Sequence, residues 1–388
     1  MADAGLGSRS NPLAASVYLR RNLSKTAPLM GVIILAVMLI AGIVSLINSI
    51  PLSIKVIYAY SKQYVAVTPR GNPFLTPLFM KVVEDESPVE LERVMVIRGS
   101  GVEVKSIVGN WPFVVLGLER SDMDYYLARM SSEVVEGRLP EAGKPEAVIS
   151  ETMSRNLGLG IGGILQKPDE AESFSPMPVK VVGIADGANW FAFTSIEYQR
   201  ENHFPNIDAF MAFAKSPADQ LKLDNWTEEQ LAGQNAQVFT YRQLEKQADT
   251  MFTILYQILN VVIGTLVVVI TLMMGMLINI FLSQRVQEFG LLQALGYTKR
   301  GLLRRVLVET TIFVVGGWFL GLAVAFGLLN LVKVVLMDPR AFALDTTDWS
   351  AYSYSLPVPV AIFVVSLVTV WVKFKKFDPV GIVERRLV

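Results

Sequence analysis

The chain has 388 residues, and its 35 basic and 35 acidic side chains give a formal net charge of zero. Only 18% of the residues are charged, below the ~25% usual in soluble domains, and the mean hydropathy is +0.41. This composition indicates a membrane protein. The chain has no cysteine and one histidine, which excludes disulfides, thiol catalysis and metal sites built from cysteines or several histidines.

Four apolar stretches are long enough to cross a bilayer, whose ~30 Å hydrocarbon core requires about 20 helical residues. The predicted spans are residues 29–50, 250–282, 310–336 and 356–372. The run Thr250 to Gln284 contains 35 residues without a charge, equivalent to about 52 Å of helix. We therefore expect part of the second helix to extend beyond the membrane.

Basic residues predict the orientation. Segments 1–28, 283–309 and 373–388 together hold fourteen basic and five acidic residues, a net charge of +9. Such segments stay in the cytoplasm, so both termini are predicted to lie inside. Segments 51–249 and 337–355 then lie outside and share the compensating negative charge. Apolar and basic residues alternate within 1–28, which favours an amphipathic helix in contact with membrane lipids rather than nucleic acid.

Segment 51–249 is long enough to form a domain and mixes strand-like and helical patterns. Strand-like runs occur at 94–97, 102–108, 114–116, 179–184 and 209–213. Helices are predicted over 122–130, 150–157 and 227–232, the last with Thr227 as its N-cap. The predicted fold is therefore four transmembrane helices, one plus three, with a large α+β extracytoplasmic domain between spans one and two.

No motif in the chain supports catalysis. Gly137 to Pro145 resembles a phosphate-binding loop, but the spacing of its glycines is wrong and Pro145 replaces the Ser or Thr that would hold magnesium. The dispersed carboxylates form no acid–base pair. We expect no catalytic residue, no metal site and no cofactor bound by this chain.

Two features each leave two interpretations open. Trp190, Phe191 and Phe193 either fold into the core or expose a patch for a partner or amphiphile. Gly317 and Gly321 form a GxxxG pattern, which serves either as a dimer face or in close helix packing within one subunit.

The predicted cytoplasmic segment 283–309 contains two short helices separated by a break. Gly296 suits the left-handed position after a helix, and Thr298 can cap the helix that follows. Arg285 and Glu288 lie at i and i+3, where an exposed pair would contribute only ~0.3–0.5 kcal/mol.

This segment resembles the coupling segment of the MacB/FtsX-like permease family of ABC transporters. The matching residues are Arg285, Glu288, Phe289, Gly290, Leu292, Leu295, Gly296 and Tyr297. Asp378 and Pro379 resemble the family's tail motif, and segments 136–150, 157–162 and 181–184 resemble its outer domain. The resemblance implies that these coupling and tail residues contact an ATPase subunit.

The resemblance also implies the partners. We expect a homodimer with two copies of a separate ATPase subunit, which binds ATP and Mg. MacB carries its ATPase domain before span one, whereas only 28 residues precede span one here. A periplasmic adaptor or lipoprotein is a further expected partner, and the expected location is the bacterial inner membrane.

Two functions fit the resemblance. One is export or extraction of an amphiphilic drug, peptide, lipid or lipoprotein by mechanotransmission, driven by the partner ATPase. The alternative is an FtsX-like signal transmitter that activates an extracytoplasmic cell-wall hydrolase or another partner without moving a solute.

Overall fold

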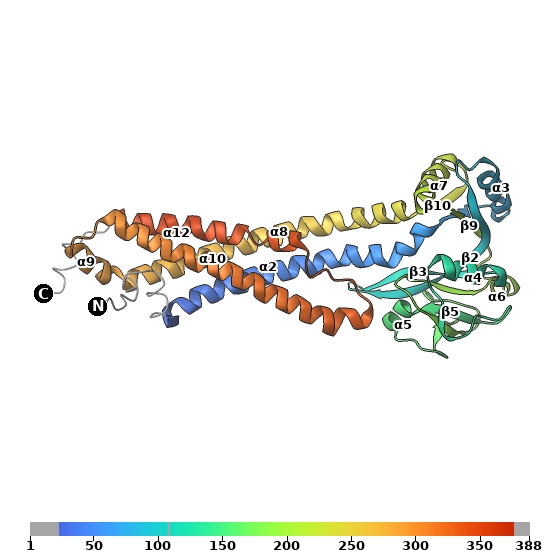
Figure 1. Cartoon of the computed structure of the whole chain (residues 1–388), viewed down its shortest axis with the longest axis horizontal. Coiled ribbons are helices and arrows are strands. Elements are labelled where there is room, and N and C mark those ends of the chain that lie inside the picture. The colour runs from blue at the N-terminus through green and yellow to red at the C-terminus, as the bar shows by residue number, and fades with distance from the viewer. Residues whose placement is uncertain (1–22, 108, 376–388) are drawn as a thin grey trace, which may run out of the picture. The chain divides into compact units, whose positions relative to one another are not determined.

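The computed structural model describes residues 23–107 and 109–375 (Figure 1). Its contacts divide the chain into two units. The membrane unit comprises the described residues up to Asn48, Leu255–Leu331 and the residues from Asp345 onward, and the sheet unit comprises Ser49–Ile254 and Val332–Leu344. The predicted amphipathic segment 1–28 lies almost entirely outside the described residues, and so does most of the tail 373–388.

Among the described residues, four helices are long and apolar enough to cross a membrane, as the sequence predicted. They are α2 (Leu23–Ile57), α8 (Tyr241–Gln284), α10 (Lys299–Val332) and α12 (Pro357–Lys375). Two shorter helices are α9 (Val286–Ala294) and α11 (Trp349–Ser353). The 44 residues of α8 correspond to about 66 Å of helix, so the expectation that this helix outruns the bilayer is confirmed. Both α2 and α8 continue from the membrane unit into the sheet unit.

Two glycines of α10 allow this helix to approach α2 closely. A Cβ atom on Gly317 would lie 3.1 Å from Ile33 Cγ2, and one on Gly321 would lie 2.8 Å from Val37 Cβ. Both approaches are tighter than ordinary side-chain contacts allow. The GxxxG pattern therefore lies in the packing of two helices within one subunit.

We predict that Gly321→Ala destabilises the membrane unit by about 1–3 kcal/mol, because the added methyl must displace Val37 or the α2 backbone. Gly327→Ala on the same helix is the matched control, since nothing lies within 4 Å of its added Cβ. Alanine should be neutral or stabilising there. Unfolding in mixed detergent micelles measures both, and equal midpoints for the two variants would contradict the packing argument.

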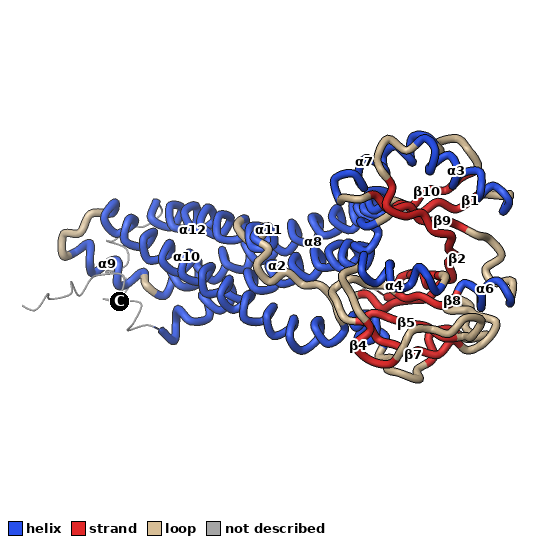
Figure 2. Tube along the Cα trace, turned by 45° about the vertical axis from the view of Figure 1, so that its right-hand side comes forward, coloured by secondary structure: helices blue, strands red, loops and turns tan. Residues whose placement is uncertain are grey.

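The sheet unit contains one ten-stranded sheet in the order β10-β1-β9-β2-β3-β8-β5-β7-β4, with β6 paired to β7 (Figure 2). The strands are β1 (Val65–Pro69), β2 (Leu91–Ser106), β3 (Gly109–Leu118), β4 (Val134–Gly137), β5 (Glu146–Ser150), β6 (Ile164–Gln166), β7 (Val179–Ala185), β8 (Ala192–Ser195), β9 (Ala209–Ala214) and β10 (Ala236–Phe239). The helices are α3 (Thr76–Glu86), α4 (Arg120–Arg129), α5 (Glu151–Leu157), α6 (Ile196–Glu201) and α7 (Pro217–Gln230). The α+β prediction for this domain is confirmed.

The long strand β2 belongs to both halves of the sheet. Its residues Leu91 to Ile97 pair with β9, and its residues Arg98 to Ser106 pair with β3. Side chains of α3, α7, β1 and β9 form one core, and strands β2 to β8 with α4 form another. The five predicted strand runs fall in four strands, because 94–97 and most of 102–108 belong to the single strand β2. Two of the predicted helices, 122–130 and 150–157, correspond to α4 and α5.

The predicted short helix 227–232 is wrong. Helix α7 instead begins at Pro217, with the Ser216 hydroxyl accepting a hydrogen bond from the Asp219 amide at 3.1 Å. Proline at the first helical position after a serine cap is a stronger start signal than an internal threonine. Thr227 is fully buried inside the helix rather than at its cap.

The aromatic run in the sheet unit forms core, not a contact surface. Trp190, Phe191 and Phe193 are each at most 1% exposed, and Phe191 and Phe193 both make edge contacts with the Tyr126 ring. The prediction that these three side chains contact a partner or substrate is therefore wrong. All four residues of β8 and the two residues before it are buried inside the sheet unit, where the large apolar area of the three aromatic side chains stabilises the fold.

One buried carboxyl makes the sheet unit sensitive to pH. Burial raises the pKa of Asp224 to about 7, and the charge of Glu228 adds to this, although a hydrogen bond from Gln220 opposes it. The folded domain therefore retains a proton that the unfolded chain loses near its ordinary pKa of 3.8. Its stability falls as pH rises from about 4 to about 7.

We predict that Asp224→Asn raises the thermal midpoint of the sheet unit by roughly 5 °C at pH 8 and by less than half as much at pH 5. Tryptophan emission of the full-length chain in detergent measures the midpoint. Asp219→Asn is the control, because bonds from Lys222 and Ser216 lower the pKa of Asp219 and its loss brings no gain. A pH-independent effect of Asp224→Asn would refute the assignment.

Candidate functional site

The turn between α8 and α10 forms a compact helical corner. Helix α8 ends at Gln284, and α9 follows after Arg285. Gly296, with φ of 94°, follows α9: its amide donates to Gln293 O at 2.9 Å, and the Tyr297 amide donates to Leu292 O at 3.1 Å. This hydrogen-bond pattern closes the helix end as a Schellman motif.

The start of α10 is capped as the sequence predicted. The Thr298 hydroxyl accepts a hydrogen bond from the Gly301 amide at 3.1 Å. A left-handed glycine and a capping threonine two residues later end one helix and begin the next within three residues. The corner is thereby set by local hydrogen bonds at both of its ends.

Arg285 is buried at the centre of this corner, with its side chain only 6% exposed. Its Nε donates to Glu288 Oε2 at 2.9 Å, and its Nη1 donates to Glu309 Oε2 at 2.7 Å. The guanidinium carbon lies 5.3 Å from the Phe281 ring centre and 5.1 Å from the Phe289 ring centre. These are cation–π distances, so one side chain joins α8, α9 and α10.

A second arginine completes the charge balance around Glu309, whose side chain is 1% exposed. Arg305 Nε lies 3.2 Å from Glu309 Oε1, so the carboxylate has a cationic partner on each oxygen. Burial alone would lower the pKa of Arg285, but bonds to Glu288 and Glu309 raise it above its ordinary value. We refer to Phe281, Arg285, Glu288, Phe289, Arg305 and Glu309 as the Arg285 cluster.

The outer surface of the corner is apolar. Leu291 is 68% exposed, Leu295 76% and Tyr297 46%. Leu291 and Leu295 lie at i and i+4, on the same side of the helix. We call these three residues the α9 patch. A large apolar patch on such a short segment indicates contact with another protein.

The residues predicted for ATPase coupling thus separate into two groups. Arg285, Phe289 and Gly290 are buried and shape the corner, whereas Leu295, Gly296 and Tyr297 are exposed. Glu288 and Leu292 are partly exposed. Asp378 and Pro379 lie outside the described residues.

Four residues of this site were not among the predicted coupling residues: Phe281, Leu291, Arg305 and Glu309. Leu291 lies one helical turn before Leu295, and that spacing was the available signal for the α9 patch. Glu309 lies 24 positions from Arg285, and nothing local in the sequence predicts their contact.

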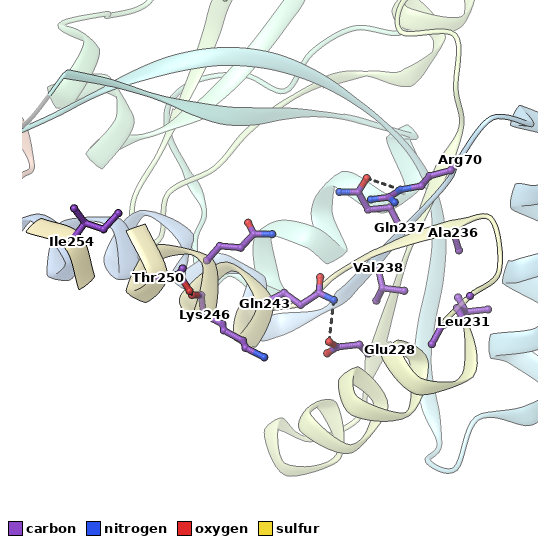
Figure 3. Close-up of a pocket in the computed structure, with 13 residues that line it drawn as sticks. Arg70, Glu228, Leu231, Ala236, Gln237, Val238, Gln243, Lys246, Thr250 and Ile254 are labelled. Carbon is purple, nitrogen blue, oxygen red and sulfur yellow. Dashed lines mark hydrogen bonds between the residues drawn. The ribbon is translucent and has the colours of Figure 1, made fainter. Parts of the chain in front are cut away.

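The sheet unit contains a groove with a volume of about 1030 Å³ (Figure 3). It lies between the first turns of α8, the end of α7 and strand β10. Leu231 and Val238 line it with buried apolar side chains. At its rim Arg70 donates to Gln237, and Gln243 donates to Glu228. Its polar groups bind one another, and they form no arrangement for acid–base chemistry.

Within residues 23–107 and 109–375, no cluster of His, Asp or Glu could hold a metal.

The chain has four membrane-crossing helices in a one-plus-three order, with a domain after the first and the corner held by the Arg285 cluster after the second. This arrangement is that of a multi-pass membrane protein of permease type. Two family models match the chain. Residues 26–230 match the MacB-like periplasmic core domain, and residues 260–379 match the FtsX-like permease C-terminal domain.

The chain therefore belongs to the MacB/FtsX-like family of ABC transporter permeases. Members of this family are the membrane components of ABC transporters and work with an ATPase partner. The chain has the large α+β extracytoplasmic domain of the family between its first two spans.

A search of solved structures finds domains that are similar to part of this chain. The periplasmic region of MacB from Actinobacillus actinomycetemcomitans is 10% identical, with 48% of this chain and 92% of that chain covered and a TM-score of 0.29. The extracellular domain of the transporter YknZ from Gram-positive bacteria is 14% identical, with 46% and 100% covered and a TM-score of 0.27. No curated protein matches the chain.

We predict that Arg285→Met destabilises the membrane unit by about 3 kcal/mol, because the buried Glu309 loses its ion pair with Arg285 and keeps the one with Arg305. Glu288→Gln should cost less than about 1 kcal/mol, since Glu288 is 42% exposed. Unfolding in mixed micelles measures the two variants side by side. Equal losses would mean that Arg285 behaves as an ordinary surface residue.

Proposed function

We propose that this chain is the permease subunit of an ABC transporter that transmits ATP-driven movement from the α9 patch to the sheet unit. A separate ATPase subunit, present in two copies and binding ATP and Mg, docks on the patch. The transported or extracted cargo is an amphiphile such as a drug, peptide, lipid or lipoprotein.

The Arg285 cluster carries this proposal. It fixes α9 to the C-terminal end of α8. Helix α8 is continuous over its 44 residues, and its first turns belong to the sheet unit. A rotation of α9 must therefore move the end of α8, because the joint between them is buried, charged and hydrogen-bonded. A continuous helix then transmits the displacement over its length.

One cavity in the membrane unit, lined by Leu29, Met274, Thr310 and their neighbours, has a volume of about 20 Å³. That volume holds about one water molecule, so this cavity is too small for the proposed cargo.

An apolar stripe along α8 supports the proposed homodimer. Its exposed members are Ile254, Ile258, Val261, Val262, Val268, Val269, Leu272, Met273, Met276 and Ile280. At membrane depth, such a stripe is covered either by lipid or by the same stripe of a second copy. A twofold pair of stripes would give each dimer two α9 patches for two ATPase subunits.

The positive charge of the predicted inner segments supports a location in the bacterial inner membrane with both termini in the cytoplasm. The α9 patch then faces the cytoplasm, where an ATPase finds its nucleotide. The sheet unit faces outside, where an adaptor or lipoprotein would contact it.

The alternative function is that of an FtsX-like signal transmitter, which the match of residues 260–379 to the FtsX-like model supports. The same corner and helices would then move the sheet unit to activate a cell-wall hydrolase or another partner. Loss of the gene would leave an amphiphile in the membrane in the first case and reduce hydrolase activity in the second.

We predict that Leu291→Asp combined with Leu295→Asp abolishes co-purification with the partner ATPase, because two charges replace the exposed apolar contact. The detergent-solubilised complex is isolated through a tag on the ATPase and quantified by subunit ratio. Nucleotide hydrolysis by the ATPase should also lose its dependence on the permease.

Leu221→Asp is the matched control, since Leu221 is a 56% exposed leucine on α7 of the sheet unit. It should leave complex formation unchanged. Complex formation by the double variant at the level of the wild type would rule out the α9 patch as the docking surface.

A further inference from the structure

The segment after α10 is part of the sheet unit. Residues Val332–Leu344 belong to it, although α10 itself up to Leu331 belongs to the membrane unit. The segment contains a π-helical turn, η3 (Lys333–Met337), and a 3₁₀ turn, η4 (Asp338–Arg340). The sequence predicted the end of span three up to residue 336 and an outer loop from residue 337, and neither accounts for the contacts of segment 332–344.

Asn156 of α5 binds this segment with a buried side chain that is 2% exposed. Its Nδ2 donates to Arg340 O at 2.9 Å and to Lys105 O at 2.9 Å, while its Oδ1 accepts from the Lys105 amide at 2.8 Å. One side chain thus joins segment 332–344 to strand β2, and all of these bonds are to backbone groups. Buried amide bonds of this kind are costly to break.

Ser53 of α2 binds the other end of the segment. Its hydroxyl donates to Ala343 O at 3.1 Å and accepts from the Ala343 amide at 3.2 Å. Ser53 is 3% exposed. A single hydroxyl therefore satisfies both backbone groups of Ala343, and the segment is held at two separate points.

Packing and backbone conformation support the same attachment. Ala341 packs against the main core of the sheet unit, and Met337 and Leu344 are buried. Ala341 has φ of 56°, a left-handed conformation that is uncommon for alanine. An exposed connecting loop would not need a left-handed alanine, so the attachment to the core fixes this conformation.

The other end of α10 is fixed as firmly. Glu309 lies in the first third of α10 and is held by Arg285 and Arg305. Helix α10 then runs without interruption to Val332. The same helix therefore begins beside the α9 patch and ends in the segment that Asn156 and Ser53 hold.

We propose that segment 332–344 is a third mechanical connection to the sheet unit, which carries displacement of α9 along α10 to α5 and β2. This inference rests on the proposed function, because it requires that α9 is displaced. Segment 332–344 is then a connection in addition to α2 and α8. Asn156 and Ser53 are positioning residues, because they hold this segment in place.

The attachment is tested first on the purified full-length chain, without any ATPase. In Ser53→Ala, in Asn156→Ala and in the double variant, hydrogen exchange of amides 337–343 should accelerate roughly tenfold. Asn189→Ala is the matched control, since Asn189 also donates to a backbone carbonyl of the sheet unit, Met130 O at 3.0 Å, away from this segment. Exchange as slow in all three variants as in the control would overturn the proposal.

Transmission is tested next on the complex with the ATPase, comparing the nucleotide-free state with ATP and vanadate. In the wild type and in Asn189→Ala, exchange should change in α9, in segment 332–344 and in α5. In the double variant the change in α9 should remain, while the change in α5 should fall to less than half. Ser53→Ala alone keeps the test valid if Asn156→Ala does not fold.

The two hypotheses fail differently. A response of α5 that is as large in the variants as in the wild type, with α9 still responding, overturns the third connection and leaves the proposed function intact. An α9 that does not respond to nucleotide in any variant overturns the proposed function, and the third connection with it.

Discussion

The burial of one arginine at a helix corner is the interaction on which the membrane unit depends. Arg285 would be costly to remove from water without partners, and the fold supplies two carboxylates and two aromatic rings. These partners come from three helices: Phe281 from α8, Glu288 and Phe289 from α9, and Glu309 from α10. The corner therefore has one favourable arrangement, and any alternative leaves a charge unpaired in an apolar setting.

Much of this architecture could be predicted from the sequence, because it depends on local signals. The four spans follow from uninterrupted apolar runs, and the end of α9 follows from Gly296 and Thr298, whose conformations are set by neighbouring residues. The contact of Arg285 with Glu309 could not be predicted, since it joins residues 24 positions apart in two helices. For the same reason an exposed pair and a buried cluster could not be distinguished at Arg285 and Glu288.

The sheet unit shows where local patterns mislead. Trp190, Phe191 and Phe193 have the composition of a binding patch, and only the tertiary fold shows that Tyr126 and its neighbours cover them. In α7 a serine followed by proline determined the helix start, and the threonine further along is an interior residue. Apolar content alone does not say whether a side chain is covered, and this depends on strands far apart in sequence.

The shared strand β2 restricts how proteins of this kind can change in length. Its first half is in register with β9 and its second half with β3, so one inserted residue would turn the side chains of at least one half to the wrong face. Insertions and deletions are therefore expected in the turns between strands rather than within β2. Diversity in what such domains recognise should accumulate in those turns, while the strand that unites the two halves keeps a constant length.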